Sequence, residues 1–331
     1  MHYRQRVALI YGGRGFEREV SLMGEKAMRP IIENFFDCLP VLIEKDGGWL
    51  YNGRTRVVPA KVGNDSGFFA PNTGEFIPVD CAFLLLHGDF GEDGVVQGML
   101  EGADTRYIGC KTKTSAICRD KAVLKCVARE LNIPTLPYIT AWKGEDAVEM
   151  AERHIGYPMF VKPTCLGSSI GCSPAEDREK LIEALEKAFA VSDRVIIEKL
   201  IRPKRELECG YFATKSKELF TDVGEIITYD EFYDYDGKYK SEKTNLAVSA
   251  DVPREVQEKI KEYSRRLVKF LGIRQMSRID FFLSGDRIYF NEINTIPGMT
   301  KGSLYPKMLE AAGIVREKFV EMLILDTLSG G

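Results

Sequence analysis

The sequence has little of what zinc sites and disulfide frameworks need. Only three histidines occur in 331 residues, and the eight cysteines contain no C-x-x-C pair. Zinc is held by closely spaced cysteine and histidine ligands, and disulfide frameworks are typical of short secreted chains. The composition therefore argues against both kinds of site and predicts reduced thiols in a cytoplasmic protein.

Long apolar runs are also absent. The run Val7–Tyr11 near the N-terminus is too short for a signal peptide or a membrane span, and no later stretch is long enough to cross a bilayer. The net charge of -3 gives no general attraction to nucleic acid or to an anionic membrane, so we expect neither partner. An apolar fraction of 44% and a charged fraction of 29% are typical of a globular protein, and 331 residues allow two or three domains.

Widespread nucleotide-binding motifs are missing as well. Gly13 and Gly15 follow the first apolar run, but the third glycine of G-x-G-x-x-G would fall at Arg18, which disfavours a nicotinamide enzyme. No G-x-x-x-x-G-K-[ST] phosphate loop occurs. If the protein binds a phosphate, another loop must hold it.

The first third of the chain predicts a small parallel sheet flanked by helices. Val7–Tyr11 and Cys81–Leu86 are continuous apolar runs that end in glycine turns, as buried parallel strands do. A helical pattern begins at about Val20, after the first glycine turn. Gly47–Gly74 is rich in Gly, Asn and Asp, which predicts hairpins and loops added to this domain.

The middle of the chain predicts alternating helices and strands. We expect a helix over Ser115–Leu131 and strands at Met159–Lys162 and Val195–Leu200. Between these strands, Ser173–Glu176 has the spacing of a capping box with proline at the first helical position, which predicts a helix start. Pro253 opens a further helix, whose apolar stripe indicates core packing.

A hairpin closer to the C-terminus brings several polar side chains together. Turn residues at Ser284–Asp286 separate two alternating runs, Ile279–Leu283 and Arg287–Ile293. Side chains alternate across a strand, so a register that pairs Leu283 with Arg287 places one set of polar groups on a single face. That set is Arg278, Asp280, Glu292 and Asn294.

This cluster needs a compensating charge. Two carboxylates about 4 Å apart repel by roughly 4 kcal/mol at an effective dielectric of about 20, so either one is protonated or a cation lies between them. A cation is the simpler solution. Oxygen ligands without His or Cys suit Mg²⁺ or Mn²⁺, and magnesium with few protein ligands usually carries substrate phosphates. The alternative is a surface hairpin with scattered charges.

The segment Lys162–Gly171, KPTCLGSSIG, is the best candidate for a phosphate-binding loop. Its glycines let the backbone approach a phosphate and present N–H donors, while Lys162 supplies a positive charge at the end of a strand. A solvated polar loop after a strand is the alternative.

Three further segments are consistent with a substrate site. Glu19 lies in REVS, after the first glycine turn, where a carboxylate could bind a substrate ammonium. His87–Gly94, HGDFGEDG, follows another strand of the same domain. Tyr233–Tyr239, YDYDGKY, is an aromatic and charged loop of the kind that closes over a site.

Eight segments, in order along nearly the whole chain, resemble those of the D-alanine:D-alanine ligases of the ATP-grasp superfamily. They are EREVSL, HGDFGEDG, DKAVLK from Asp120, VKPTCLGSSIG, IIEKL, YDYDGKY, SRID and NEINTIPGMTKGS. The resemblance implies an ATP-dependent ligase that joins two D-alanines through an acyl phosphate for the bacterial cell wall. It also implies an ATP-grasp fold with a doubly wound domain over 1–109, a central lid over 110–201 and a metal-carrying domain over 202–331.

The resemblance also implies which residues contact ATP. Lys121 and Lys162 match the phosphate-binding lysines, and Glu206 lies near the position of a ribose-binding carboxylate. The other nucleotide contacts that it implies are Ser169, Glu198, Lys199, Ile201 and Lys238. The metal ligands that it implies, for two Mg²⁺ or Mn²⁺ ions that bridge ATP, are Asp280, Glu292 and Asn294.

Further residues match the family's substrate-binding and catalytic groups. Arg278 and the Gly298 N–H correspond to oxyanion donors. Glu19 matches the carboxylate that anchors the ammonium of the first D-alanine, with Ser168 and Tyr239 as its hydrogen-bonding companions. Around the second D-alanine, the resemblance implies Lys238, Ser303 and the Leu304 N–H. It also implies His87, in the HGDFGEDG segment, as a further substrate contact.

The pair Lys238 and Tyr239 goes, within the family, with D-alanine as the second substrate, so we expect a D-alanyl-D-alanine product. The alternatives are a related ligase that uses D-serine or D-lactate and a noncatalytic ATP-binding protein. Departures from the family pattern at Gly15 and Gln275–Ser277 are expected to alter local packing only. A homodimer is implied by the resemblance alone.

Overall fold

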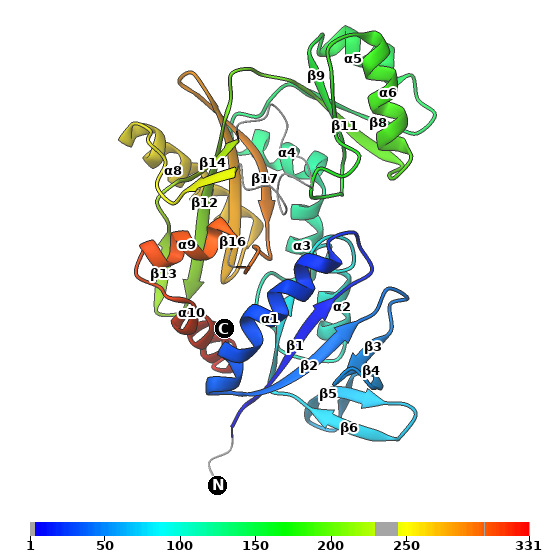
Figure 1. Cartoon of the computed structure of the whole chain (residues 1–331), viewed down its shortest axis with the longest axis vertical. Helices are drawn as coiled ribbons and strands as arrows, with labels where there is room; N and C mark the ends of the chain where they lie inside the picture. Colours follow the sequence, from blue (N-terminus) through cyan, green and yellow to red (C-terminus); the bar gives the residue numbers. More distant parts are fainter. Residues whose placement is uncertain (1–3, 229–243, 301, 331) are drawn as a thin grey trace.

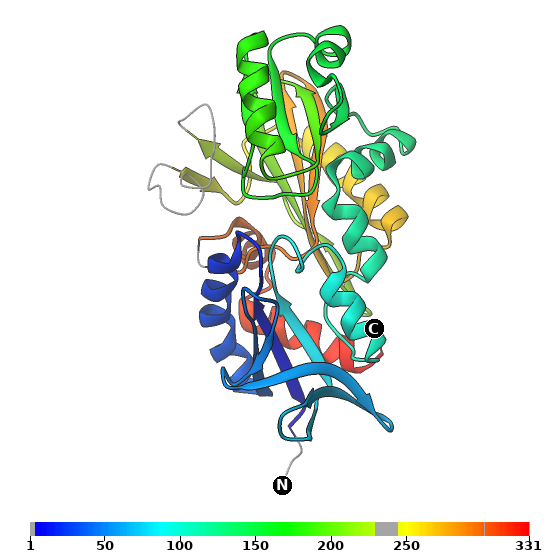
Figure 2. The same ribbon diagram turned by 90° about the vertical axis from the view of Figure 1, so that its right-hand side faces the viewer.

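The computed structural model describes residues 4–228, 244–300 and 302–330. Three β-sheets lie along the long axis of the molecule, with the third sheet between the first and the second (Figures 1 and 2). Three clusters of buried apolar side chains accompany these sheets. This mixed α/β architecture confirms the predicted fold class.

The first sheet contains both predicted parallel strands and has the order β6-β5-β4-β3-β2-β1-β7. β1 (Arg6–Gly12) pairs in parallel with β2 (Asp37–Ile43) and with β7 (Cys81–Leu85), and α1 (Arg18–Phe35) follows β1. The glycine-rich region after β2 forms antiparallel strands that widen this sheet. They are β3 (Trp49–Tyr51), β4 (Thr55–Val62), β5 (Asp65–Ala70) and β6 (Glu75–Pro78), and the short helix α2 (Val95–Gly102) follows β7.

The second sheet is antiparallel, with the order β10-β9-β11-β8. Its elements are β8 (Tyr138–Trp142), α5 (Ala147–His154), β9 (Met159–Pro163), β10 (Ser173–Ala175), α6 (Arg178–Phe189) and β11 (Arg194–Lys199). The predicted capping box at Ser173 is wrong, because Ser173 pairs with Val161 as the start of β10. The helix begins five residues later, where the Asp177 carboxylate accepts a hydrogen bond from the Lys180 N–H.

The third sheet carries the predicted hairpin. Its path is β15-β14-β12-β16-β17, with β13 also paired to β12 and α8 (Arg254–Leu271) packed against β12. Its strands are β12 (Arg205–Thr214), β13 (Lys217–Phe220), β14 (Gly224–Thr228), β15 (Thr244–Ala247), β16 (Met276–Ser284) and β17 (Arg287–Asn294).

The hairpin register differs from the predicted one. Ser284, not Leu283, pairs with Arg287, and a bulge between Asp280 and Phe281 shifts the pairing again. Beyond the bulge Asp280 lies opposite Glu292, while Arg278 lies opposite Asn294. The predicted convergence of the four polar residues is therefore confirmed, although the bulge brings it about.

The predicted helix over Ser115–Leu131 is two helices, α3 (Thr112–Arg119) and α4 (Lys121–Glu130). The break lies at Asp120, whose carboxylate accepts hydrogen bonds from the N–H groups of Ala122 and Val123 and so caps α4. The break leaves Arg119 at the end of one helix and Lys121 at the start of the next.

Two helices that are far apart in the chain share buried clusters with the third sheet. Leu124 and Ala128 of α4 lie in one of these clusters. The predicted start of a central unit at residue 110 stays a proposal. Phe319 and Leu323, in the last helix, share a cluster with the first sheet and with Phe212 and Met276 of the third. The last two helices are α9 (Leu304–Ala311) and α10 (Arg316–Leu328). The boundary near residue 201 remains a proposal.

The described part of the chain holds no helix with the length and apolar character needed to cross a membrane.

Candidate active site

Two cavities meet at the edge of the third sheet. The larger, of about 580 Å³, is lined by residues of the first sheet's loops, the segment 167–168, β17 and the start of α9. The smaller, of about 220 Å³, lies between the second and third sheets. Lys121, Arg278 and Glu292 line both cavities, so the two share a wall.

The shared wall contains a tightly held arginine. Arg278 donates to both carboxylate oxygens of Asp280, at 2.8 and 2.7 Å, and its Nε lies 3.2 Å from Glu208 Oε1. Burial by itself lowers the pKa of Arg278, but Asp280 and Glu208 outweigh it and raise that pKa above its ordinary value. The guanidinium is therefore a permanent, oriented donor at the junction of the cavities.

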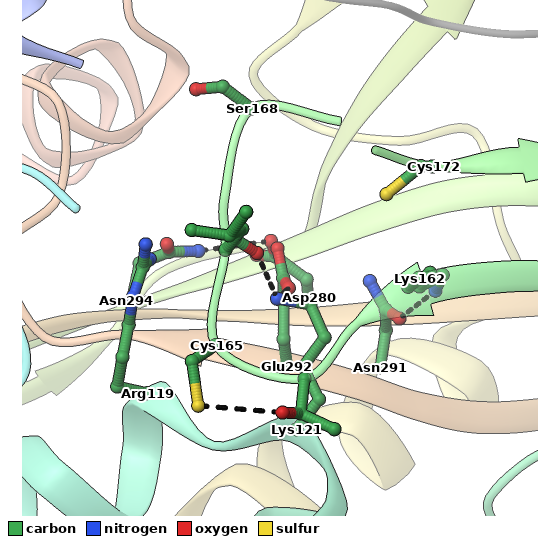
Figure 3. Close-up of polar contacts among 12 residues, drawn as sticks. Arg119, Lys121, Lys162, Cys165, Ser168, Cys172, Asp280, Asn291, Glu292 and Asn294 are labelled. Atoms are coloured by element: carbon green, nitrogen blue, oxygen red, sulfur yellow. Dashed lines mark hydrogen bonds and ion pairs between the residues drawn. The ribbon is translucent and has the colours of Figure 1, made fainter. Parts of the chain in front are cut away.

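The predicted metal ligands Asp280, Glu292 and Asn294 lie together (Figure 3). Asp280 and Glu292 are cross-strand neighbours, and Asn294 Nδ2 donates to Asp280 Oδ2 at 3.3 Å. Among the described residues no group of three or more His, Cys, Asp or Glu could hold a metal by itself. A hard cation fits this donor set of two carboxylates and an amide when phosphate oxygens complete its coordination.

A buried ion-pair triad anchors Lys162, the predicted phosphate-binding lysine. Glu198 is 1% exposed and lies 2.6 Å from both Lys125 Nζ and Lys162 Nζ. Lys162 also contacts Asn291 Oδ1 at 3.3 Å. Because both carboxylate oxygens of Glu198 are occupied by lysines, its side chain orients Lys162 toward the smaller cavity.

The loop after β9 has the geometry expected for binding an anion. Ser168 and Ser169 have φ angles of +51° and +59°, an uncommon left-handed pair for residues with a Cβ. Lys121 Nζ donates to Leu166 O at 2.7 Å and lies 3.3 Å from Glu292 Oε2. The loop is thereby tied to the wall that both cavities share.

The structure corrects the predicted ammonium anchor. Glu19 is exposed and lines neither cavity, whereas Glu17 lines the larger one and accepts a hydrogen bond from Ser168 Oγ at 2.6 Å. Glu17 is the N-cap residue of α1, and a residue two positions further along a helix points away from it. Glu17 therefore takes the position expected of Glu19.

Glu17 is one of three carboxylates that surround a buried arginine, Arg119. Arg119 lies 3.6 Å from Glu17, 3.4 Å from Asp89 and 3.5 Å from Glu92. Burial raises the pKa of Glu92 to about 7, although Arg119 opposes this shift. Burial lowers the pKa of the neighbouring His87 below its ordinary value, which keeps its imidazole neutral at pH 7.

The far end of the larger cavity is formed by the start of α9. Ser303 is the N-cap residue of that helix, and its Oγ lies 2.9 Å from Thr300 Oγ1. Gly298, Ser303 and Leu304 all line the cavity. A Cβ at Gly298 would lie 2.8 Å from Ser303 Oγ, so glycine suits this position. A helix N-terminus with free N–H groups favours a carboxylate ligand.

Comparison with known proteins identifies the family. Residues 6–110 match the family described as D-ala D-ala ligase N-terminus, and residues 127–325 match the one described as D-ala D-ala ligase C-terminus. The chain belongs to the D-ala D-ala ligase family. This ligase membership agrees with the ATP-grasp resemblance of the sequence.

Individual relatives of the ligase cover almost its whole length. The D-alanine–D-alanine ligase of Caldicellulosiruptor bescii is 37% identical, over 96% of this chain and 94% of its own. The solved D-alanyl-alanine synthetase A of Vibrio cholerae is 30% identical, with a TM-score of 0.90 over 99% of this chain and 100% of that one. The Bacillus anthracis ligase solved in complex with ATP is 28% identical, with a TM-score of 0.75 over 98% of each chain.

The structure places most of the predicted site residues of the ligase at the two cavities. His87, Ser168, Arg278, Gly298, Ser303, Leu304 and Asn294 line the larger one. Lys121, Lys162, Ser169, Glu198, Lys199, Ile201, Glu206, Asp280 and Glu292 line the smaller one. Lys238 and Tyr239 lie outside the described residues.

Sequence reasoning missed Arg119, Glu92 and Glu208, which line the cavities, and Lys125, which pairs with Glu198 in the interior. Two of them lay inside segments already singled out. Lys125 is one helical turn after Lys121, and Glu92 is in HGDFGEDG, so spacing alone could have found them. No sequence signal marked Arg119 or Glu208.

The buried triad predicts a large loss of stability in Glu198→Gln. Removing the carboxylate leaves two lysine ammonium groups unpaired in the interior, which is expected to cost about 3–5 kcal/mol of unfolding free energy. The matched control is Glu183→Gln, because Glu183 pairs with Lys180 at the surface and should change stability by less than about 0.5 kcal/mol. Urea unfolding of both variants measures the difference, and equal midpoints would contradict the prediction.

The same triad predicts a pH dependence of stability. Burial alone would raise the pKa of Glu198, but Lys125 and Lys162 outweigh it and lower that pKa to about 2. Because the folded pKa lies below the ordinary value, the stabilisation is present above that value and is lost as pH falls toward 2. Unfolding free energies measured on acidification should fall more steeply in the parent than in Glu198→Gln.

Proposed function

We propose that the larger cavity binds two D-alanines and the smaller one ATP, and that the enzyme joins the amino acids at the wall between them. The chain is an ATP-dependent, ADP-forming D-alanine–D-alanine ligase of peptidoglycan synthesis. This assignment rests on the wall that the two cavities share, which contains Lys121, Arg278 and Glu292. A phosphoryl group must pass across this wall from one cavity to the other. The ATP complex of the Bacillus anthracis relative supports the nucleotide assignment.

The first D-alanine is activated at the shared wall. Its ammonium is held by Glu17 and its carboxylate faces Arg278. A carboxylate oxygen attacks the γ-phosphorus of ATP, the bond to the bridging oxygen breaks, and ADP leaves with the electron pair. Lys121 and Lys162 hold the phosphates in line, and the product of this step is an acyl phosphate.

The second D-alanine completes the reaction. Its carboxylate lies at the N-terminus of α9, near Ser303 and the Leu304 N–H, with its amine toward the acyl carbon. The amine attacks that carbon, Arg278 and the Gly298 N–H stabilise the oxyanion, and phosphate leaves as the amide forms and the nitrogen loses a proton. Lys238 and Tyr239 stay predicted contacts of this site.

Asp280, Glu292 and Asn294 would hold two Mg²⁺ or Mn²⁺ ions, which when bound neutralise the phosphate charge of ATP. The nucleotide base and ribose would lie along Lys199, Ile201 and Glu206. Glu206 is held at 2.6 Å by Lys204 Nζ.

Product analysis with controlled metal tests this proposal. With ATP, Mg²⁺ and D-alanine we expect D-alanyl-D-alanine, ADP and phosphate in equal amounts, and no phosphate release without D-alanine. Chelation with EDTA should abolish turnover, and added Mg²⁺ or Mn²⁺ should restore it. Full activity in EDTA would contradict the metal assignment.

The same assay tests the second substrate. With D-serine or D-lactate present at the concentration of D-alanine, mass spectrometry should find mainly the D-alanine dipeptide. A mixed product in excess at neutral pH would overturn the preference predicted from Lys238 and Tyr239. Magnesium-dependent ATP binding without any product would instead favour the noncatalytic alternative.

We also propose, from the family resemblance, a cytoplasmic homodimer without nucleic-acid or membrane partners. A solution mass of 37.3 kDa, that of one chain, would contradict the dimer.

A further inference from the structure

Arg119 is a charged residue close to Glu17, the proposed ammonium anchor. It is the last residue of α3, and its guanidinium reaches Glu17, Asp89 and Glu92 of the first domain. Its side chain is 9% exposed and lines the larger cavity. We propose that Arg119 is a positioning residue that keeps the Glu17 carboxylate aimed at the ammonium of the first D-alanine.

The Glu17–Arg119 pair is enclosed by backbone on two sides. A Cβ at Gly88 would lie 2.6 Å from Glu17 Oε2, and one at Gly167 would lie 2.9 Å from the same oxygen. The Cβ at Gly167 would also lie 3.2 Å from Arg119 NH1. Ser168 Oγ donates to the other carboxylate oxygen of Glu17, so the Glu17 carboxylate has one orientation. Arg119 lies against one side of that carboxylate.

Arg119 supplies the positive charge that balances three neighbouring carboxylates. Glu17, Asp89 and Glu92 face it together, and burial raises the pKa of both Asp89 and Glu92 while Arg119 opposes that rise. For Arg119 itself, burial lowers the pKa, but these carboxylates outweigh it. Without the guanidinium, these neighbouring carboxylates would repel one another, and a rotated Glu17 would bind an ammonium poorly.

The phosphate site does not depend on Arg119 in the same way. Lys121 lies two residues further on, but it is held by its own contacts to Leu166 O and Glu292, and Asp120 caps the helix that carries it. Loss of Arg119 should therefore weaken D-alanine binding and leave ATP binding unchanged. This selectivity separates a positioning role from a general structural one.

Steady-state kinetics of Arg119→Met test the proposal, which rests on the proposed function. We expect the apparent KM for D-alanine to rise about tenfold or more, with the KM for ATP nearly unchanged. Arg119→Lys, which keeps the positive charge but not the planar guanidinium with its several N–H donors, should recover part of the loss. The matched control is Arg266→Met, because Arg266 contacts Leu131 O at the other end of α4, away from both cavities, and should leave both KM values unchanged.

A double-mutant cycle with Glu17→Gln shows whether Arg119 acts through Glu17. The double variant should have the D-alanine KM of Glu17→Gln alone, since the group that Arg119 positions is then absent. Additive effects would overturn the proposal. So would a parallel rise of both KM values with a lower melting temperature in Arg119→Met, or a D-alanine KM equal to that of the parent. A parent enzyme that forms no dipeptide would instead refute the proposed function.

Discussion

Arg278→Ala should lower kcat by roughly a hundredfold or more while the protein still binds ATP. An oriented donor aimed at a developing oxyanion is typically worth about 3–4 kcal/mol of transition-state stabilisation. We propose Arg278 as such a donor, because Asp280 and Glu208 hold it between the two cavities. Single-turnover measurement of dipeptide formation reports the chemical step directly, and near-normal turnover would refute the role of Arg278.

Two further measurements separate catalysis from folding in this variant. The substitution leaves Asp280 and Glu208 without their guanidinium, so unfolding free energy must be measured alongside the rate. Arg278→Lys is the matched variant, because lysine keeps the charge but cannot donate to Asp280 in the same bidentate way. It should preserve more stability than alanine and remain slow. A fast lysine variant would mean that charge alone is sufficient.

Glu17→Gln should lower kcat/KM for D-alanine by about thirtyfold or more, because losing one partner of a desolvated charge pair costs about 2–5 kcal/mol. Glu19→Gln is its control, since Glu19 has the same chemistry two residues away but is exposed and lines neither cavity. Its kinetics should match those of the parent. The opposite pattern, with Glu19→Gln impaired and Glu17→Gln normal, would restore the sequence-based assignment.

Local sequence patterns do not distinguish the roles of Glu17 and Glu19. Both occur in the EREVSL segment, and periodicity cannot tell which of them faces the substrate. The answer depends on the turn before α1, which makes Glu17 the N-cap residue beside Ser168, a residue 151 positions later in the chain. Packing between domains therefore decides the assignment.

The polar cluster of the hairpin, in contrast, was predicted from a local sequence pattern. Alternation along β16 and β17 predicted Arg278, Asp280, Glu292 and Asn294 on one face, and they do converge, because the pairing at the turn is shifted by one residue and the bulge shifts it by one more. Alternation is a property of the strand itself, so it survives an error in register of an even number of residues. The oxygen-rich donor set, and hence the class of cation, followed from residue types alone.

Helix boundaries and domain limits depended on contacts that the sequence does not display. Asp120 interrupts the predicted helix because its side chain caps α4, and α4 packs on the third sheet through Leu124 and Ala128. The last helix packs between the first and third sheets, where Phe319 lies against Phe212 of β12. An amphipathic pattern shows that a face is buried, but not against which partner.

The sequence by itself determined the ligase family, the α/β class and the oxygen-ligand hairpin, because these depend on residue types and on spacing within short segments. Only the tertiary structure decided that Glu17 and not Glu19 lines the substrate cavity, and that Arg119 lies among three carboxylates. Such clusters draw on residues far apart in the chain, and their charges acquire a meaning only when folding removes water and sets the distances between them.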